Sequence, residues 1–320
     1  MRAYVIRRIL LMIPTLFILS VLVFMSVRFI PGDVIDMMMQ QMMLSGALLD
    51  MDREAFERVL GLDRPIYVQY ADWIAGILVR GTLGESLMHE FTIEQRILGR
   101  LPVTLELGLL AILIGWAIAL PVGIYSAVRR DGVADYAGRS AAIIGLATPN
   151  FWLGIMVMVY PAIWWGWSPP LRLVRFIDNP PGNLAMFLIP SLILGTGSAA
   201  GLMRMTRTMM LEVLRQDYIR TAWSKGLRER VVVVRHAIKN GMIPIVTIIG
   251  MQLPILVGGS VIIENIFNLP GLGRLMVLAL QERDYPVVQG VNLMFGSVVI
   301  ANNLLIDLVY ASLDPRIRYR

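Results

Sequence analysis

Residues 104–128 read TLELGLLAILIGWAIALPVGIYSAV, and this stretch decides the fold class of the chain. Glu106 is its single charged side chain. A helix rises 1.5 Å per residue, so about 20 apolar residues cross the roughly 30 Å of hydrocarbon in a bilayer. The stretch therefore predicts a membrane-spanning helix.

The composition of the whole chain points the same way. Of the 320 residues, 57% are hydrophobic and 16% are charged, which is too apolar for a soluble domain. The net charge is +6, but the basic residues flank apolar runs, so membrane topology explains them better than nucleic-acid binding. The chain has no cysteine, which excludes a disulfide framework and a thiolate metal site. We expect membrane lipid, and no nucleic acid, as a partner.

Further apolar runs predict an all-α membrane protein with six transmembrane helices in a single domain, residues 1–320. The six predicted spans are Ile9–Phe29, Thr104–Val128, Ser140–Trp165, Leu184–Met203, Met242–Ile263 and Val287–Tyr310. The first follows two arginines, as in a signal peptide. It is longer than the apolar region of about 7–15 residues in such a peptide and has no small-x-small cleavage site, so we expect it to remain as a helix.

The distribution of charge between the loops predicts the orientation. With the N-terminus inside, 18 Lys and Arg residues fall in inner segments and 10 in outer segments. Acidic residues run the other way, with 6 inside and 15 outside. Positive residues are retained on the cytoplasmic side. Both termini are therefore predicted to be cytoplasmic.

The largest outer segment, residues 31–101, is predicted to be an extracytoplasmic insertion after the first helix. Apolar residues at helical spacing within it are Tyr70, Trp73, Ile74, Ile77 and Leu78. They predict short helices over the outer mouth, ending at Gly81. Whether this segment is a packed connector or a docking surface is left open.

The largest inner loop, residues 204–239, holds nine basic and three acidic residues. Apolar residues that fall on one helical face are Ile219, Ala222, Trp223 and Leu227. They predict an amphipathic helix parallel to the membrane. Its charge fits binding to anionic headgroups as well as it fits binding to a protein, so both interpretations stay open.

The chain lacks the residues that would let it hydrolyse ATP. A phosphate-binding loop has the pattern G-x-x-x-x-G-K-[ST]. The two lysines are Lys225, which precedes a glycine, and Lys239, which precedes Asn240, and neither fits. The two histidines, His89 and His236, are predicted on opposite sides of the membrane, so they do not form a metal site. Any ATPase must be another polypeptide.

A few polar residues within the predicted spans leave other functions to consider. Ser191 and Ser198 have no histidine or lysine near them in sequence, which favours serines that pack helices over a nucleophile. Glu106 and Asp307 are candidates for carrying protons, but each is predicted near an end of its helix. A stand-alone ion-coupled secondary carrier or channel is therefore the alternative function, with a membrane enzyme behind it.

Residues 217–230, DYIRTAWSKGLRER, resemble the coupling loop of ATP-binding-cassette (ABC) importer permeases. The general pattern in that family is Glu-Ala-Ala, three residues, then Gly. Here Arg220, Thr221 and Ala222 occupy the first three places and Gly226 matches the glycine. These departures are similar to those of the dipeptide, oligopeptide and nickel permeases.

The resemblance to that subfamily extends over the whole chain. Its segments are FIPGD (29–33), LGLDRP (60–65), LPVTLE (101–106), ATPNF (147–151), ENIFNLPGLG (264–273), RDYPVVQ (283–289) and LDPRIRY (313–319). Their order and spacing resemble the first of the family's two permease subunits, which has a long outer insertion after helix one.

The resemblance implies a type I ABC importer permease fold in the prokaryotic inner membrane. The chain would form half of a translocation pathway for peptides or a similar small solute and work by alternating access. The implied partners are a second homologous permease subunit, two ATP-binding-cassette ATPase subunits and an extracytoplasmic solute-binding protein. ATP and Mg would be bound by the ATPase subunits, and this chain would hold no cofactor and no catalytic residue.

The resemblance also implies which residues couple the chain to the ATPase. They are Tyr218, Arg220, Thr221, Ala222, Lys225, Gly226 and Arg228. A glycine inside a helix costs about 0.8–1.0 kcal/mol relative to alanine, so Gly226 fits a close approach or a helix end. We interpret Pro270, Gly271 and Gly273 as a simple turn in preference to a gate.

Overall fold

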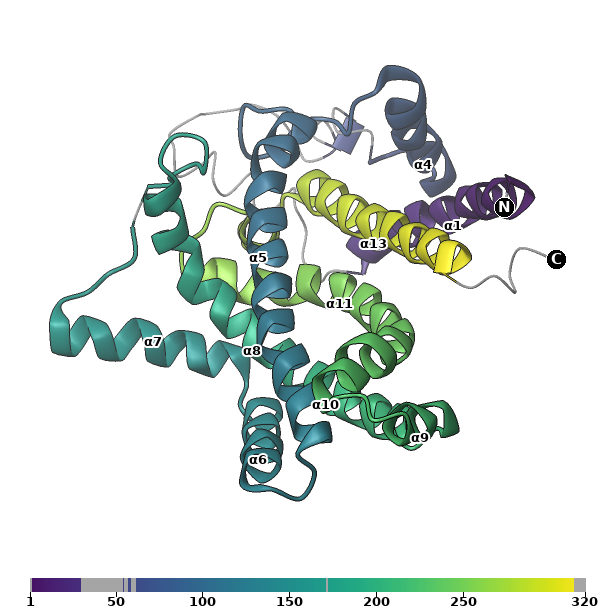
Figure 1. Cartoon of the computed structure of the whole chain (residues 1–320). Helices are drawn as coiled ribbons and strands as arrows, with labels where there is room; N and C mark the ends of the chain where they lie inside the picture. The colour runs from purple at the N-terminus through teal and green to yellow at the C-terminus, as the bar shows by residue number, and fades with distance from the viewer. Residues whose placement is uncertain (1, 30–53, 55–56, 59–61, 171, 314–320) are drawn as a thin grey trace. The chain divides into compact units, whose positions relative to one another are not determined.

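The computed structural model describes residues 2–29, 54, 57–58, 62–170 and 172–313 (Figure 1). Within these ranges the side chains of residues 2–4, most of 243–259 and 309–313 are not described. Almost all of the described chain is helical, and its one β-type pairing is an isolated bridge between Glu85 and Thr92. The predicted all-α class is therefore confirmed.

The helices follow one another through short connections. They are α1 (Arg2–Arg28), α4 (Ile66–Ala75), η1 (Gly76–Arg80), α5 (Ile93–Val128), α6 (Val133–Ala147), α7 (Asn150–Trp165), α8 (Pro180–Leu214), α9 (Asp217–Ser224), α10 (Glu229–Val231), η2 (Val232–Ile238), α11 (Lys239–Ile266), α12 (Leu272–Gln281) and α13 (Tyr285–Leu313). The chain divides into two compact units, one with residues 103–273 and 301–320 and one with residues 2–102 and 274–300. A single domain over residues 1–320 remains a prediction.

Four helices of the described chain are long and apolar enough to cross a membrane. They are α1, α5, α8 and α13, and the bent pair α6 and α7 makes a fifth if it counts as one span. The predicted span Met242–Ile263 lies within α11, where most side chains are outside the described set. A multi-pass membrane protein is therefore confirmed, while the count of six spans stays a prediction.

The third predicted span, Ser140–Trp165, is wrong as one continuous helix. The chain bends by 89° between α6 and α7. Thr148 is extended there, with φ −93° and ψ 117°, and Pro149 follows it. A proline has no backbone N–H to donate and pushes the preceding residue out of the helical region. The two helices therefore meet at a corner inside ATPNF, one of the segments that carried the family resemblance.

Two helices are longer than their predicted spans. α5 begins at Ile93, well before Thr104, so Glu106 lies inside the helix and not one turn from its start. α8 continues past Met203 to Leu214, so the first part of the predicted inner loop 204–239 is helical. Hydropathy locates the apolar part of a helix, whereas hydrogen bonding continues as far as the backbone allows.

In the first unit α5 and α8 approach each other closely at glycines (Figure 1). A Cβ atom at Gly195 would lie 2.6 Å from the carbonyl oxygen of Ala111, and one at Gly123 would lie 2.8 Å from that of Met203. Membrane helices commonly associate through such small residues, because water is not available to drive their packing. Around them lies a buried apolar core that includes Leu107 and Phe187.

In the second unit the predicted helix of the insertion is present. α4 and η1 span residues 66–80, and Gly81 ends them with φ 67° in the left-handed region. α4 packs on α1 through aromatic side chains, with 5.3 Å between the ring centroids of Phe24 and Tyr70. The hydroxyl oxygens of Tyr70 and Ser20 lie 2.8 Å apart, forming a hydrogen bond across the same contact.

Residues 82–92 of the second unit are held by two carboxylates of residues 282–284. Asp284 is buried and accepts hydrogen bonds from the hydroxyl of Ser86 and, at 3.2 Å, from the backbone N–H of Leu87. The Nε2 atom of His89 lies 2.9 Å from a carboxylate oxygen of Glu282. His89 therefore has a structural partner distant in sequence.

Candidate functional site: the helix α9 and its surroundings

The predicted amphipathic helix is present as α9 (Asp217–Ser224), between the end of α8 and the helical segment that begins at Glu229. Gln216 precedes it in an extended conformation, with φ −71° and ψ 149°. Asp217 lies in its first turn, where a negative charge interacts favourably with the helix N-terminus. The helix is short because the chain changes direction at both of its ends.

One face of α9 is anchored in a small apolar core. Ile219 is fully buried and Ala222 is 7% exposed. We call the core the α9 base cluster, and its buried members are Ala127, Met210, Ile219, Ala222, Val232, Val233 and Ala237. These residues come from the ends of α5 and α8, from α9 and from η2.

The predicted apolar face is right for two of its four residues. Ile219 and Ala222 are buried, whereas Trp223 is 43% exposed and Leu227 is 37% exposed. Leu227 follows the end of the helix, so the helical spacing used to place it does not apply there. Trp223 shares the turn of Ala222 but leaves its ring at the surface.

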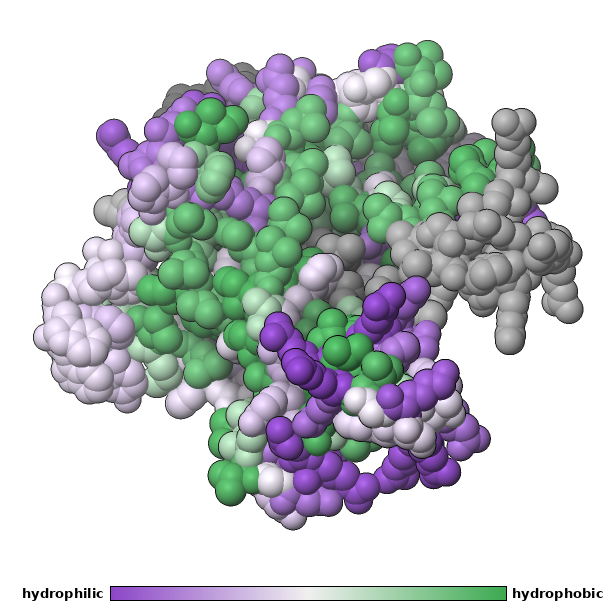
Figure 2. Space-filling view, in the orientation of Figure 1, coloured by the Kyte–Doolittle hydropathy of each residue, from purple (hydrophilic) through white to green (hydrophobic). Residues whose placement is uncertain are grey.

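The other face of α9 is polar and open. The exposed predicted coupling residues are Tyr218, Arg220, Thr221, Lys225, Gly226 and Arg228. Tyr218 accepts a hydrogen bond of 2.9 Å from the side chain of Asn240, which fixes its hydroxyl. Arg220 pairs with Asp217 at 3.4 Å, but both side chains are exposed, so this pair adds little stability. In Figure 2 hydrophilic side chains gather over α9 and α10, beside the apolar surface of α5.

Gly226 ends α9 with a left-handed turn. Its φ is +74°. The backbone N–H of Gly226 donates to the carbonyl of Trp223 at 2.9 Å, and that of Leu227 donates to the carbonyl of Ala222 at 3.4 Å. This pair of bonds is the Schellman motif, which favours glycine at this position. No atom lies within 4 Å of the position a Cβ would take, so the helix end, and not a close approach within this chain, explains the glycine.

The helical segment after α9 connects it to the long helices. Arg228 caps this segment in an extended conformation, and α10, η2 and α11 continue without a break from Glu229 to Ile266. Arg129, just after α5, lies 3.6 Å from Glu229. Together with the base cluster, these contacts join α9 to the ends of α5, α8 and α11.

A second group of buried polar residues was missed by the sequence analysis. Glu264 is fully buried and accepts a hydrogen bond of 2.7 Å from Thr104, whose hydroxyl accepts one of 2.8 Å from the backbone N–H of Leu272. A Cβ at Gly271 would collide with the carboxylate of Glu264, and one at Gly273 with the backbone of Val261. The interpretation of these glycines as a simple turn is therefore incomplete, because the chain needs them to close around Glu264.

The remaining polar candidates lie inside helices. Ser198 donates to the carbonyl of Gly195 at 2.9 Å in its own helix, as expected of a serine that packs helices. Glu106 and Asp307 are half-buried. Among the described residues, no group of three His, Asp or Glu side chains is arranged to hold a metal ion.

Comparison with known proteins gives matches over the full length of the chain. A family described as "binding-protein-dependent transport system inner membrane component" matches residues 119–319, and its N-terminal counterpart matches residues 1–108. The oligopeptide transport system permease protein AppB of Bacillus subtilis is 38% identical over 322 residues, covering 100% of both chains. The dipeptide transport system permease protein DppB of Escherichia coli is 38% identical over 344 residues, again covering 100% of both.

A solved structure shows the same fold. It is described as an amino acid ABC transporter with histidines, and it aligns with a TM-score of 0.52 at 15% identity, over 69% of this chain and 95% of that one. At this identity the likeness concerns the fold alone. The full-length sequence matches go further: the chain belongs to the family of inner-membrane permease components of binding-protein-dependent transport systems.

Proposed function

We propose that this permease forms half of the translocation pathway of an ATP-driven ABC importer. It pairs with a second homologous permease, docks on two ATPase subunits and receives solute from an extracytoplasmic binding protein. The proposed topology has six spans, both termini in the cytoplasm, an extracytoplasmic insertion at residues 31–101 and a cytoplasmic coupling loop at residues 204–239. ATP and Mg belong to the ATPase subunits in this proposal.

The proposed solute is a peptide or a similar small molecule. The support is the naming of relatives that cover the whole chain as oligopeptide and dipeptide transport permeases. The described side chains include no cluster suited to a metal ion, so the proposal assigns no metal-binding role to this subunit. Selection among solutes would rest with the binding protein that delivers them.

The observation that carries the coupling proposal is the two-sided character of α9. A polar, exposed face that includes Arg220, Thr221 and Lys225 lies opposite Ile219, which is fully buried. An exposed polar face suits a protein partner, and the anchored face gives that partner something to move. The proposal is that closure of the ATPase dimer shifts α9 and that the base cluster passes this shift to α5, α8 and α11.

Ala222 has a different place in this proposal from the other coupling residues. It is 7% exposed, and it belongs to the base cluster. Direct contact with an ATPase is therefore assigned to the exposed residues around it, and Ala222 supports α9 from beneath. A small side chain suits that position because it allows α9 to lie close to η2.

The experiment that tests coupling replaces Gly226 with leucine in the reconstituted complex of permeases, ATPases and binding protein. Gly166 provides a matched control, since it also ends a helix, has φ +63° and has no atom within 4 Å of a Cβ position. Both replacements carry the same backbone strain, roughly 1–2 kcal/mol. Only Gly226 lies on the proposed ATPase-facing surface, whereas Gly166 is assigned to the opposite side of the membrane.

We expect Gly226→Leu to insert into the membrane normally and to lower solute-stimulated ATPase activity by about tenfold or more, a loss of more than about 1.4 kcal/mol of coupling. Gly166→Leu should leave the stimulation within a factor of about two. If both variants keep the stimulation, or if both lose it equally, the assignment of α9 as the coupling element is wrong.

A further inference from the structure

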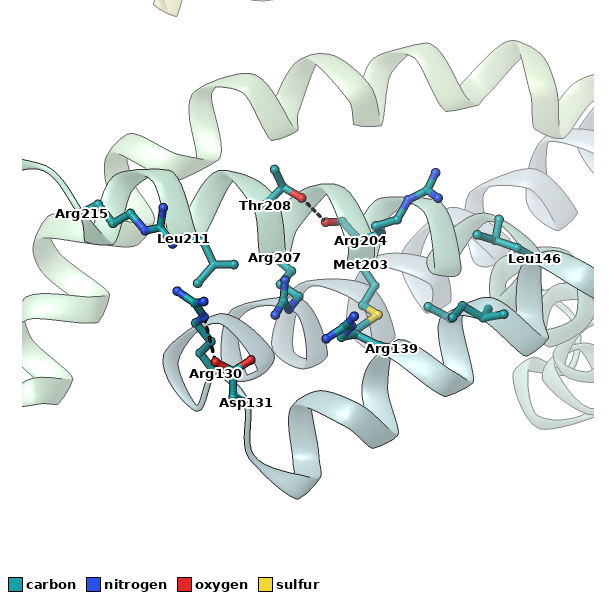
Figure 3. Close-up of a pocket in the computed structure, with 12 residues that line it drawn as sticks. Arg130, Asp131, Arg139, Leu146, Met203, Arg204, Arg207, Thr208, Leu211 and Arg215 are labelled. Atoms are coloured by element: carbon teal, nitrogen blue, oxygen red, sulfur yellow. Dashed lines mark hydrogen bonds and ion pairs between the residues drawn. The ribbon is translucent and has the colours of Figure 1, made fainter.

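A cavity of about 540 Å³ lies between α6 and α8, on the side of the first unit that we assign to the cytoplasm (Figure 3). Its basic lining residues are Arg130, Arg139, Arg204, Arg207 and Arg215. Its apolar lining includes Ile143, Leu146 and Met203. The sequence analysis drew attention to neither α6 nor this end of α8, and the coupling proposal uses none of these side chains.

The cavity has an excess of positive charge. Arg207 is paired with Asp135, and Arg130 lies 3.1 Å from Asp131. In the described part of the chain the other three arginines of the lining form no ion pair with an acidic side chain. Five guanidinium groups against two carboxylates leave three positive charges facing a confined space, which favours an anionic ligand.

The floor of the cavity is built and buried. Asp135 is fully buried and accepts two hydrogen bonds of 2.7 Å, from Nε and one Nη of Arg207, and one of 3.1 Å from the backbone N–H of Asp131. The bidentate bond fixes the plane of the Arg207 guanidinium, while its remaining N–H groups are not used by Asp135. The donor is thus held in place before any ligand arrives.

An apolar wall continues from the basic end along α6. Arg139, Ile143 and Leu146 follow one another at helical spacing on one face. Ile143 is 66% exposed and Leu146 is 49% exposed. Figure 3 shows Leu146 at the end of the cavity away from Arg130 and Arg215. A ligand that fits both parts has an anionic head and a hydrocarbon tail.

We propose that this cavity binds the headgroup of an anionic phospholipid, with the phosphate among Arg139, Arg204 and Arg207 and an acyl chain along Ile143 and Leu146. Basic pockets between membrane helices on the cytoplasmic side suit such headgroups. Free phosphate offers the same chemistry to the arginines but leaves the apolar wall uncovered, so we commit to the lipid. Only the assignment to the cytoplasmic leaflet rests on the proposed function.

The test measures lipid binding to the intact complex by native mass spectrometry, with cardiolipin, phosphatidylglycerol and phosphatidylcholine as probes. The variant Arg139→Gln/Arg204→Gln removes two exposed charges that form no ion pair in the described chain, so the buried floor is left intact. The control Arg230→Gln/Arg235→Gln removes the same charge from exposed positions of the same inner loop that do not line the cavity. A third variant, Ile143→Gln, changes the apolar wall alone.

The wild-type complex should bind cardiolipin and phosphatidylglycerol in preference to phosphatidylcholine. The cavity variant should lose about tenfold or more of that affinity, the control should keep it within about twofold, and Ile143→Gln should weaken lipid binding as well. Equal affinity in the cavity variant and the control overturns the proposal. Displacement of the lipid by inorganic phosphate, or an Ile143→Gln variant without effect, identifies a site for a free anion and also overturns it. Because the readout is lipid binding, its failure leaves the coupling proposal untouched.

Discussion

At the scale of single residues, Glu264 shows how a buried carboxylate organises a loop. Its side chain is fully buried, and Thr104 links it to the first backbone N–H of α12. Gly271 and Gly273 pass so close to it that a side chain has no room. A buried charge is stable only where it is hydrogen-bonded, so these neighbours have to be in place together.

Replacing Gly271 with alanine should therefore destabilise the permease. The added methyl group would collide with the carboxylate of Glu264 and force a shift of the buried loop, at a cost of about 1–3 kcal/mol. Gly108→Ala is the matched control, because no atom lies within 4 Å of its Cβ position and it lies inside α5. Thermal unfolding in detergent would measure both variants.

The control should be neutral or slightly more stable than the wild type, since alanine favours a helix over glycine. A Gly271→Ala variant as stable as Gly108→Ala would show that the loop adapts easily, and the account of Glu264 as its organiser would then be wrong.

At the scale of elements, α9 is a lever whose position depends on one buried side chain. Ile219 is fully buried in the base cluster, while the opposite face of the helix is exposed. A short helix of this kind has little stability of its own, because most helical stability in proteins comes from packing. The cluster therefore decides whether a push on α9 reaches the long helices.

Replacing Ile219 with alanine should loosen α9 without unfolding the chain. Truncating a buried isoleucine costs about 2–5 kcal/mol, and we expect the loss to be concentrated in α9 and η2. Hydrogen exchange should become faster in these two elements, and solute-stimulated ATPase activity should fall. Ile144→Ala, at a position 65% exposed on α6, should change neither measurement. Unchanged exchange in Ile219→Ala would show that the base cluster does not hold the helix.

The sequence predicted elements better than it predicted their ends and contacts. Apolar runs located α1, α5, α8 and α13, because a run of about 20 apolar residues has the length of a helix that crosses a bilayer. The corner at Thr148 and Pro149 was missed, since hydropathy averages over a window while a proline acts on a single residue. The signal was present, in a proline between two apolar runs.

Within the candidate site, the sequence predicted the existence of α9 and its end at Gly226, because both depend on local patterns and a preferred left-handed residue. It did not predict that Trp223 stays at the surface or that Asp135 and Arg207 form a buried pair. These features depend on residues distant in sequence, which helical spacing alone does not place.

At the scale of the whole molecule, the full-length match to peptide transport permeases and the fold likeness to an ABC transporter agree with the resemblance drawn from the coupling loop. The chain lacks a phosphate-binding loop, so a transporter built from it needs energy from another subunit. The central claim is that this energy enters through α9.

The most direct test uses the absence of cysteine from the chain, which makes any introduced cysteine unique. Lys225 is exposed at the end of α9, and Ile177, 93% exposed and assigned to the outer side, provides the control. In the assembled complex, Lys225→Cys should form a cross-link to an ATPase subunit whose yield changes with nucleotide, and Ile177→Cys should form none. Absence of a cross-link from Lys225→Cys, or equal yields from both positions, would contradict the claim.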